Sequence, residues 1–201
     1  MILEQSALIP AIRGLGKAKN VKIVAPYGGH FTKLSDALNS ITDASISNEY
    51  YIIVAGYIAE TVQINAKSHV HVYGLPGAHV EVSATSGIHG VVFNNITNAV
   101  WRGLKVTRSG AVTTNNVYCL HVYGNTDSTV RLENCRFINA TTNGGGGTYC
   151  FGILVGGSAA PVLSGCTGQG GSGGANCYGI LVVDSAAPVL SGCTGQGGSG
   201  G

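Results

Sequence analysis

The sequence predicts an all-β protein, a right-handed parallel β-helix (solenoid) with a short N-terminal capping helix. Three observations predict it. The seventeen residues SAAPVLSGCTGQGGSGG occupy positions 158–174 and return unchanged at 185–201. Strand-like runs recur with them at spacings of 27 to 31 residues, as in solenoid proteins. One position per repeat is held only by glycine or asparagine, which indicates a bend between two strands.

The composition excludes several other classes of protein. Hydrophobic residues make up 44% of the 201 residues and charged residues only 10%, against roughly 25% in an average globular protein. The 32 glycines show no collagen period. A net charge of +2 gives no electrostatic argument for nucleic acid as a partner. No membrane span is expected, because no run reaches the ~18 apolar residues that a spanning helix needs.

Residues 1–20 are interpreted as an N-terminal segment or linker, not as a signal peptide. The first basic residue is Arg13, and Glu4 and Pro10 interrupt the apolar stretch. The chain then either stays in the cytosol or leaves by a route that needs no cleaved signal. Assembly into a phage particle is one such route, so we expect a virion or an extracellular surface.

Residues 21–201 are predicted to form the β-helix. The run VKIVAP (21–26) is strand-like, and Thr32 can cap a helix near 32–41. That helix would cover the first coil and hide its open sheet edge. Its apolar residues, spaced to share one face, are Leu34, Leu38 and Ile41. The runs YYIIVAG, TVQIN and HVHVYG follow as predicted strands.

Four repeats then follow in one frame, with coils starting near residues 88, 119, 150 and 177. The last two coils differ at only three aligned positions, Phe151/Tyr178, Gly156/Val183 and Gly157/Asp184. An apolar residue stands at one equivalent position of every coil and predicts a stacked column, namely Trp101, Leu132, Leu163 and Leu190. The predicted bends with a left-handed backbone are Gly103, Asn134, Gly165 and Gly192.

The six cysteines fall in two columns of this frame. Their C-x15-C spacing does not suggest a zinc ribbon. The second column is predicted to point inward as buried free thiols, and it consists of Cys135, Cys166 and Cys193. Disulfides between stacked neighbours, or a metal site, are the alternatives. The direction of the first column is left open by strand alternation, and it consists of Cys119, Cys150 and Cys177.

The N-terminal third carries a longer pattern, VAPYGGHFTKLSDALNSI…YYIIVAGYIAETVQINAKSHVHVYGLPG. It resembles pectinesterase-like β-helix proteins of the pectin-lyase-like superfamily, in which G-x-F-x-x-[IL]-x-x-A-[IL] precedes I-x-V-x-x-G-x-Y-x-E-x-V-x-I and V-x-G. The matching residues are Gly29, Phe31, Leu34, Ala37, Leu38, Gly56, Glu60, Val62, Ile64, Val72 and Gly74. Tyr51, Ile53 and Ile58 depart from the pattern. The resemblance covers roughly residues 21–77 and implies the fold. It implies no activity, because these residues cap and begin the β-helix.

The catalytic motifs of that superfamily are not found, so no catalytic residue is assigned. G-x-x-D-F-x-F-G and L-G-R-P-W of pectinesterases are absent. Of the polygalacturonase motifs only N-T-D occurs, at 125–127. Glycosidases need two carboxylates about 5–10 Å apart. Asp127 and Asp184 hold similar places in coils that are separated by a whole coil. They are therefore either a candidate acid pair or two solvated loop acids.

A row of tyrosines is the candidate carbohydrate-binding site. Tyr118, Tyr123, Tyr149 and Tyr178 recur around the first cysteine column, with Asp127 and Asp184 nearby. They could form an aromatic stripe that stacks on sugar rings, since long solenoid faces suit extended polymers. The alternative is ordinary strand tyrosines with half-buried rings. No cofactor and no metal site are expected, although His69 and His71 share a strand face.

The expected function is that of a phage tailspike-like or surface-fibre protein that binds cell-surface polysaccharide, by analogy at the level of the fold. The alternatives are a polysaccharide-degrading enzyme (lyase, hydrolase or esterase) with an unrecognised or intersubunit site, and a structural spacer. The second repeat ends at Gly201 without a cover for its strand edges. We therefore expect that the natural chain continues or that another copy covers this end, in a homo-oligomer and most plausibly a trimer.

Overall fold

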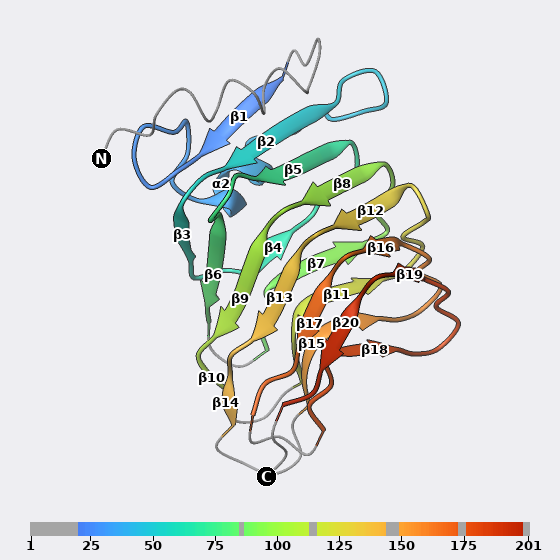
Figure 1. Ribbon diagram of the computed structural model, residues 1–201. Helices are drawn as coiled ribbons and strands as arrows, with labels where there is room; N and C mark the ends of the chain where they lie inside the picture. Colours follow the sequence, from blue (N-terminus) through green and yellow to red (C-terminus); the bar gives the residue numbers. More distant parts are fainter. Residues whose placement is uncertain (1–19, 85–86, 113–115, 144–148, 173–175, 199–201) are drawn as a thin grey trace.

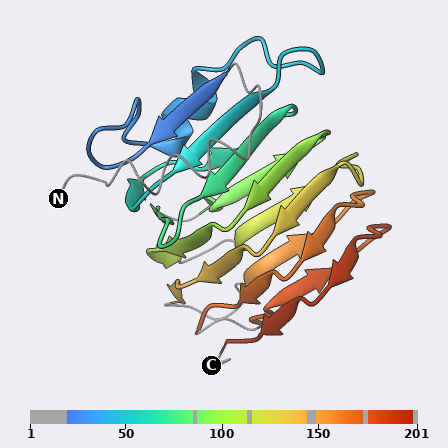
Figure 2. The same cartoon turned by 45° about the horizontal axis from the view of Figure 1, so that its top comes forward.

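The computed structural model describes residues 20–84, 87–112, 116–143, 149–172 and 176–198. The chain winds as a stack of coils in which every strand lies parallel to its equivalent in the next coil (Figures 1 and 2). The predicted class, an all-β right-handed parallel β-helix, is confirmed. Of the predicted N-terminal segment or linker, residues 1–20, only Asn20 belongs to the described residues.

Three parallel sheets form the walls of the described solenoid. Sheet 1 consists of β1 (Val21–Val24), β2 (Tyr50–Val54), β5 (Val70–Gly74), β8 (Ala99–Arg102), β12 (Val130–Glu133), β16 (Val162–Ser164) and β19 (Val189–Ser191). Sheet 2 consists of β3 (Tyr57–Glu60), β6 (His79–Ser83), β9 (Lys105–Ser109), β13 (Arg136–Asn139), β17 (Thr167–Gln169) and β20 (Thr194–Gln196). Sheet 3 consists of β4 (Ile64–Asn65), β7 (Val91–Asn94), β11 (Val117–Tyr123), β15 (Cys150–Val155) and β18 (Ile180–Val182). β10 (Ala111–Val112) and β14 (Thr142–Asn143) form a separate parallel pair.

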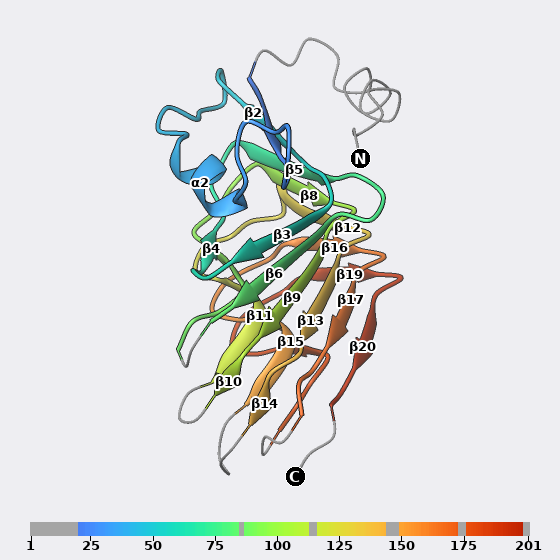
Figure 3. The same cartoon turned by 90° about the vertical axis from the view of Figure 1, so that its left-hand side faces the viewer.

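The capping helix α2 spans Leu34–Asn39 and contacts β1, β3 and β4 at one end of the stack (Figure 3). Its apolar face is buried, as predicted. The predicted capping residue is wrong, because the N-cap is Lys33 and no side chain of that position caps the helix. Instead the buried carboxylate of Glu60 on β3 accepts the backbone N–H of Ser35 at 3.0 Å and its hydroxyl at 2.7 Å. The carboxylate of Glu60 on β3 thus accepts a backbone N–H of the first helical turn that has no partner within the helix.

The predicted apolar column of sheet 1 is confirmed. Trp101, Leu132, Leu163 and Leu190 pair with one another in successive strands. All are buried except Leu190 in the last coil, which is 44% exposed. The bends between sheets 1 and 2 are also confirmed, with φ of 67°, 50°, 61° and 60° at Gly103, Asn134, Gly165 and Gly192.

The cross-section narrows toward the C-terminal coils. The side chain of Phe137 on β13 fills the interior of the solenoid, whereas Gly168 and Gly195 occupy the same column in β17 and β20. A Cβ atom at Gly168 would overlap the carbonyl oxygen of Gly179, so sheets 2 and 3 meet here backbone to backbone. Without the bulky side chain the coil closes in fewer residues. The paired Leu163 and Leu190 are 27 residues apart in the sequence, whereas the preceding pair, Leu132 and Leu163, is 31 residues apart.

Cys119 does not share a column with Cys150 and Cys177, which stay in register with each other, and the frame in sheet 3 is corrected accordingly. Tyr118 pairs with Phe151, so Cys119 lies opposite Gly152, while Cys150 lies opposite Val117. The segment that leads from sheet 2 into β15 is two residues longer than the one that leads into β11, which shifts the register of sheet 3 against that of sheet 2. Cys119 nevertheless points inward, because its Sγ donates to the carbonyl oxygen of Val106 at 3.4 Å.

The buried free thiols of the second column are confirmed. The three cysteines of this column are free thiols, and Cys135 and Cys166 are buried, whereas Cys193 in the last coil is half-buried. Their Sγ atoms donate to backbone oxygens of the preceding coil at 3.4, 3.2 and 3.4 Å. Burial raises the thiol pKa to about 12 for Cys135 and to about 11 for Cys166, so these groups stay protonated.

Candidate functional site

The outer face of sheet 3 carries a ladder of aromatic rings. His89, Tyr118, Phe151 and Tyr178 come from successive coils, and neighbouring ring centroids are 4.5, 5.4 and 5.7 Å apart. Parallel strand pairing places these side chains above one another, since equivalent residues of adjacent strands lie about 4.8 Å apart. The sequence therefore folds four separate residues into one continuous aromatic ridge along the solenoid axis.

The rings of the ladder stack face to face. Their planes differ by 25°, 6° and 28°, so each inner ring covers the face of its neighbour and presents its edge outward. Tyr178, next to the last strand of the sheet, is 44% exposed, whereas Phe151 in the middle is only 6% exposed. The ridge thus offers hydroxyl groups at Tyr118 and Tyr178, and an accessible ring at its C-terminal end.

The other two predicted tyrosines adjoin this ladder. Tyr149 is 37% exposed and stacks on Phe151 at 5.9 Å. Tyr123 stacks on His121 at 4.4 Å, and His121 meets the ring of Tyr118 edge-on at 4.7 Å. The structure therefore brings all four predicted tyrosines into one patch, with Phe151 and two histidines that the sequence analysis did not include.

Amide side chains border the aromatic rings. Asn116 accepts the backbone N–H of Tyr149 at 3.2 Å, and the Tyr178 hydroxyl donates to Asn176 at 3.4 Å. Asn176 and Tyr149 are bridged in parallel register, so the amide lies directly beside the ring. The face, which we call the aromatic–amide face, thus combines apolar rings with neutral donors and acceptors.

The two histidines of the face are held in their neutral form. Burial lowers the pKa of His89 to about 4, and the Arg108 guanidinium adds to this effect. Burial also lowers the pKa of His121 to about 4, with a smaller contribution from His89. The Nδ1 atoms of both rings are buried and have no hydrogen-bond partner. At neutral pH neither imidazole carries a charge.

The predicted acids lie in turns beyond the strands and do not form a pair with each other. The Oδ2 atom of Asp184 accepts the N–H of Gly157 at 3.2 Å, and its φ is 58°. The Oδ1 atom of Asp127 accepts the N–H of Thr129 at 2.9 Å and also the Thr129 hydroxyl. Each carboxylate is therefore engaged by hydrogen bonds that shape its own corner of the solenoid, and no hydrogen bond joins the two.

Of the other carboxylates, Glu49 directly precedes β2 of sheet 1, Glu81 lies on sheet 2 and Glu133 lies on sheet 1. Glu49 accepts from Asn98 at 2.7 Å and from the Tyr51 hydroxyl at 3.1 Å, and its pKa is lowered chiefly by the Asn98 amide. Beside it, His71 Nδ1 accepts the N–H of Val100 at 3.2 Å, so this nitrogen is not available as a general base.

Sheet 2 carries a similar isolated carboxylate. Glu81 accepts from the hydroxyls of Ser109 at 2.6 Å and Tyr57 at 2.7 Å, and these bonds, Ser109 first, lower its pKa. On sheet 1, Glu133 is held by Arg102 and Arg131. Each acid is bound by its own donors on its own sheet, which is not the arrangement of two facing carboxylates that glycosidases use.

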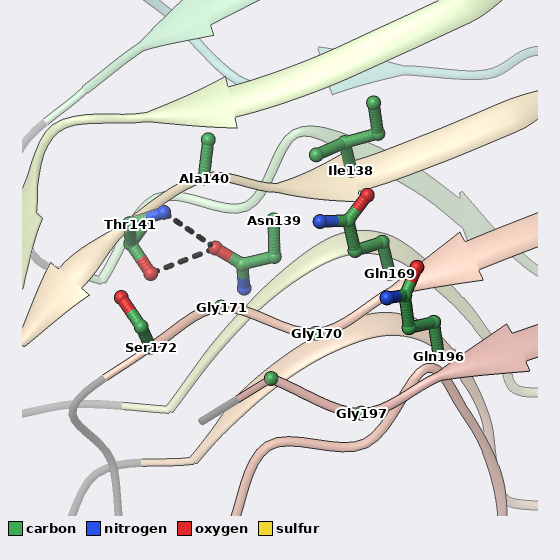
Figure 4. A pocket seen from close by; sticks show the side chains of 11 residues that line it. Ile138, Asn139, Ala140, Thr141, Gln169, Gly170, Gly171, Ser172, Gln196 and Gly197 are labelled. Carbon is green, nitrogen blue, oxygen red and sulfur yellow. Dashed lines mark hydrogen bonds between the residues drawn. The ribbon is translucent and has the colours of Figure 1, made fainter. Parts of the chain in front are cut away.

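An open hollow of about 320 Å³ lies where β13, β17 and β20 end (Figure 4). Asn139, on its wall, is fully engaged: its Nδ2 donates to the carbonyls of Val117 and Phe151, and its Oδ1 accepts from Thr141. Gln169 and Gln196 stack in register on the outer side of β17 and β20. The hollow is a polar corner of the fold, and the Asn139 amide holds the strand that carries Phe151.

The described ranges contain neither a metal-binding cluster nor a membrane-spanning helix. No group of three or more His, Cys, Asp or Glu residues in them is arranged to hold a metal ion, and His69 and His71 acquire no third ligand there. None of the helices within these ranges combines the length and the apolar character that crossing a membrane requires.

No protein-family model matches the sequence. No curated protein matches it either. Among solved structures, the pectin methylesterase from Aspergillus niger is similar over 89% of this chain and 85% of that one, with 11% sequence identity and a TM-score of 0.27. A likeness of this degree does not extend to activity, so the function has to be argued from the aromatic–amide face itself.

Proposed function

We propose that this chain binds polysaccharide through its aromatic–amide face. The observation that carries the proposal is the continuous ridge of stacked rings on sheet 3, flanked by asparagine side chains and exposed tyrosines. Sugar rings combine apolar C–H faces with hydroxyls that donate and accept. Aromatic residues with a polar end, such as tyrosine, suit such mixed surfaces. The accessible rings of Tyr149 and Tyr178 offer the stacking contacts.

The scaffold supports this role because it holds the face rigid before binding. β11 pairs with β7 on one side and β15 on the other, and β15 pairs in turn with β18. The ring positions are thereby fixed by backbone hydrogen bonds, and little conformational entropy is lost when a polymer binds. A polymer lying along the ridge would contact several coils at once.

The test is replacement of the exposed tyrosines. Tyr149→Ala and Tyr178→Ala together should lower the affinity for a bound polysaccharide by at least about tenfold, the equivalent of ~1.4 kcal/mol. Tyr27→Ala is the matched control, because Tyr27 is 85% exposed in the loop after β1 and far from sheet 3 in sequence. Affinity electrophoresis in gels that contain candidate polymers measures the effect. Equal retardation of the double variant and the parent would contradict the proposal.

The finer parts of the proposal concern assembly and location. We propose a tailspike-like or surface fibre, in a virion or on an extracellular surface, in which the chain forms a homotrimer. The half-exposed last coil supports self-association, since Val189 and Leu190 are 56% and 44% exposed. Light scattering on the purified chain tests this. A monomer at high concentration would contradict the trimer but not the binding face.

The same binding experiments distinguish binding from catalysis. Retention of a polymer without shortening is the expected result, because Glu49, Glu81 and Glu133 are each bound by their own donors and do not face one another as a pair. Release of shorter products would identify an enzyme instead, and absence of both retention and cleavage would favour a structural spacer.

A further inference from the structure

The strands of sheet 3 contain no charged residue, which sets them apart from those of the other two sheets. Their sequences are IN, VVFN, VYCLHVY, CFGILV and ILV. The strands of sheet 1 carry Lys22, Arg102, Arg131 and Glu133. The strands of sheet 2 carry Glu60, Glu81, Lys105, Arg108 and Arg136. Among the strands of the three described sheets, charged residues thus occur only on sheets 1 and 2.

The groups around the aromatic–amide face leave it uncharged at neutral pH. His89 and His121 are neutral there, because burial lowers the pKa of each to about 4. Arg108 lies beneath the face with no exposed surface, and its guanidinium donates to the carbonyls of Ile88 at 3.1 Å and Gly110 at 3.2 Å. Asp127 and Asp184 stand in the turns after the strands, where they would repel an anion.

We infer that the polymer bound by the aromatic–amide face is a neutral polysaccharide, a conclusion that rests on the proposed binding function. Desolvating the carboxylates of an acidic polymer against aromatic rings is unfavourable unless cations compensate, and sheet 3 supplies none. Sugar hydroxyls, in contrast, can exchange hydrogen bonds with the asparagine amides and tyrosine hydroxyls. The chemistry of the face therefore selects uncharged sugars.

The test begins with an array of plant and bacterial polysaccharides, both neutral and acidic, probed with the complete chain. A polymer that binds is then compared with the same polymer after oxidation of its primary hydroxyls to carboxylates, which keeps the backbone and adds charge. The neutral form should bind at least about tenfold more tightly. Its affinity should change less than about twofold between 0.05 and 0.5 M NaCl, because no charge pairs are screened.

A variant with an added cation checks that the assay detects charge. Asn116→Lys places an ammonium on the exposed edge of the face and should create salt-sensitive binding to the oxidised polymer that the parent chain lacks. Preferential, salt-sensitive binding of the parent to acidic polymers would overturn the inference while leaving the binding function intact. Binding to no polymer in the array would overturn the proposed function itself, and this inference with it.

Discussion

At the scale of single residues, the bend between sheets 1 and 2 explains why one column admits only glycine and asparagine. Gly103, Asn134, Gly165 and Gly192 all have φ between 50° and 67°. This left-handed region is unfavourable for residues with a bulky Cβ, and least so for asparagine. This column of glycine and asparagine therefore allows the backbone conformation of the bend to be predicted from the sequence alone.

Replacing Gly165 with valine should lower the free energy of unfolding by about 1–2 kcal/mol, because a β-branched residue is strained at φ 61°. Gly165→Asn is the matched control, since Asn134 occupies the same column. A Cβ atom in either variant meets the Asn134 side chain, so their difference isolates the backbone strain. Urea denaturation measures both, and equal destabilisation by the two variants would contradict the explanation.

The histidines of the aromatic–amide face predict a pH dependence of stability. Their folded pKa of about 4 lies below the ordinary value of 6.5, so the unfolded chain binds more protons between these limits. The free energy of unfolding should be greatest above pH 6.5 and fall as the pH is lowered toward 4. His71 and His79, whose pKa values burial also lowers, contribute in the same direction.

Replacing His89 and His121 with phenylalanine measures their share of this effect. The double variant should lose a clear part of the stability change between pH 6.5 and 4.5 in urea denaturation. An unchanged slope would show that these rings are not held neutral in the folded protein.

At the scale of elements, sheet 3 marks the limit of what the repeat pattern predicts. Sheets 1 and 2 follow the constant frame, and the Trp101 column and the bend column are where the sequence places them. Sheet 3 does not, because the connection into β15 is two residues longer than that into β11. Phe151 therefore stacks on Tyr118, which aligning the cysteines does not reveal.

The burial of the cysteine side chains on these strands and bends predicts the order in which they react. Under native conditions iodoacetamide should label Cys177 and Cys193, which are half-buried, well before the other four, which are buried. Burial raises the pKa of Cys119 and Cys135 to about 12, so their reactive thiolate is scarce as well as inaccessible. Mass spectrometry after short exposure measures the order, with urea-denatured protein as the control in which all six react. Early labelling of Cys135 would contradict the inward column.

At the scale of the whole molecule, the two ends of the described stack differ. α2 covers the N-terminal coil, while Val189 and Leu190 of the last coil are largely exposed. The last two coils pair in register through identical residues, Val with Val, Leu with Leu and Gln with Gln. The last coil therefore covers the inner residues of the coil before it, such as Leu163, while its own Leu190 stays partly exposed.

Inserting a second copy of residues 158–184 after Asp184 should raise the free energy of unfolding. The new coil continues without a change of sequence at either junction and adds one more interface between identical coils. Thermal melting followed by far-UV circular dichroism measures the gain, with a shuffled insert of the same composition as the control. A melting temperature at or below that of the parent would contradict self-stacking.

The fold could be predicted from the sequence more fully than the binding face. Repeats report the fold because every coil obeys the same backbone pairing. The face depends on which residues become neighbours after the register shifts in sheet 3, and on charges such as Arg108, whose burial no sequence pattern signals. The proposed preference for a neutral polymer therefore rests on a comparison of the three sheets, which the sequence alone does not provide.

The in-register pairing of equal coils has a mechanical consequence. A force that pulls on the coil of β18, β19 and β20 loads three short parallel strands, each of which pairs with one described neighbour and can peel away from it. A 27-residue coil releases on the order of 9 nm of chain at ~3.4 Å per residue. Under tension along its axis the molecule should therefore lengthen in discrete steps, beginning with the coil of β18, β19 and β20. Such a chain would act as an extensible tether that yields one coil at a time, and its first step would detach Tyr178 from Phe151 and so shorten the aromatic ridge.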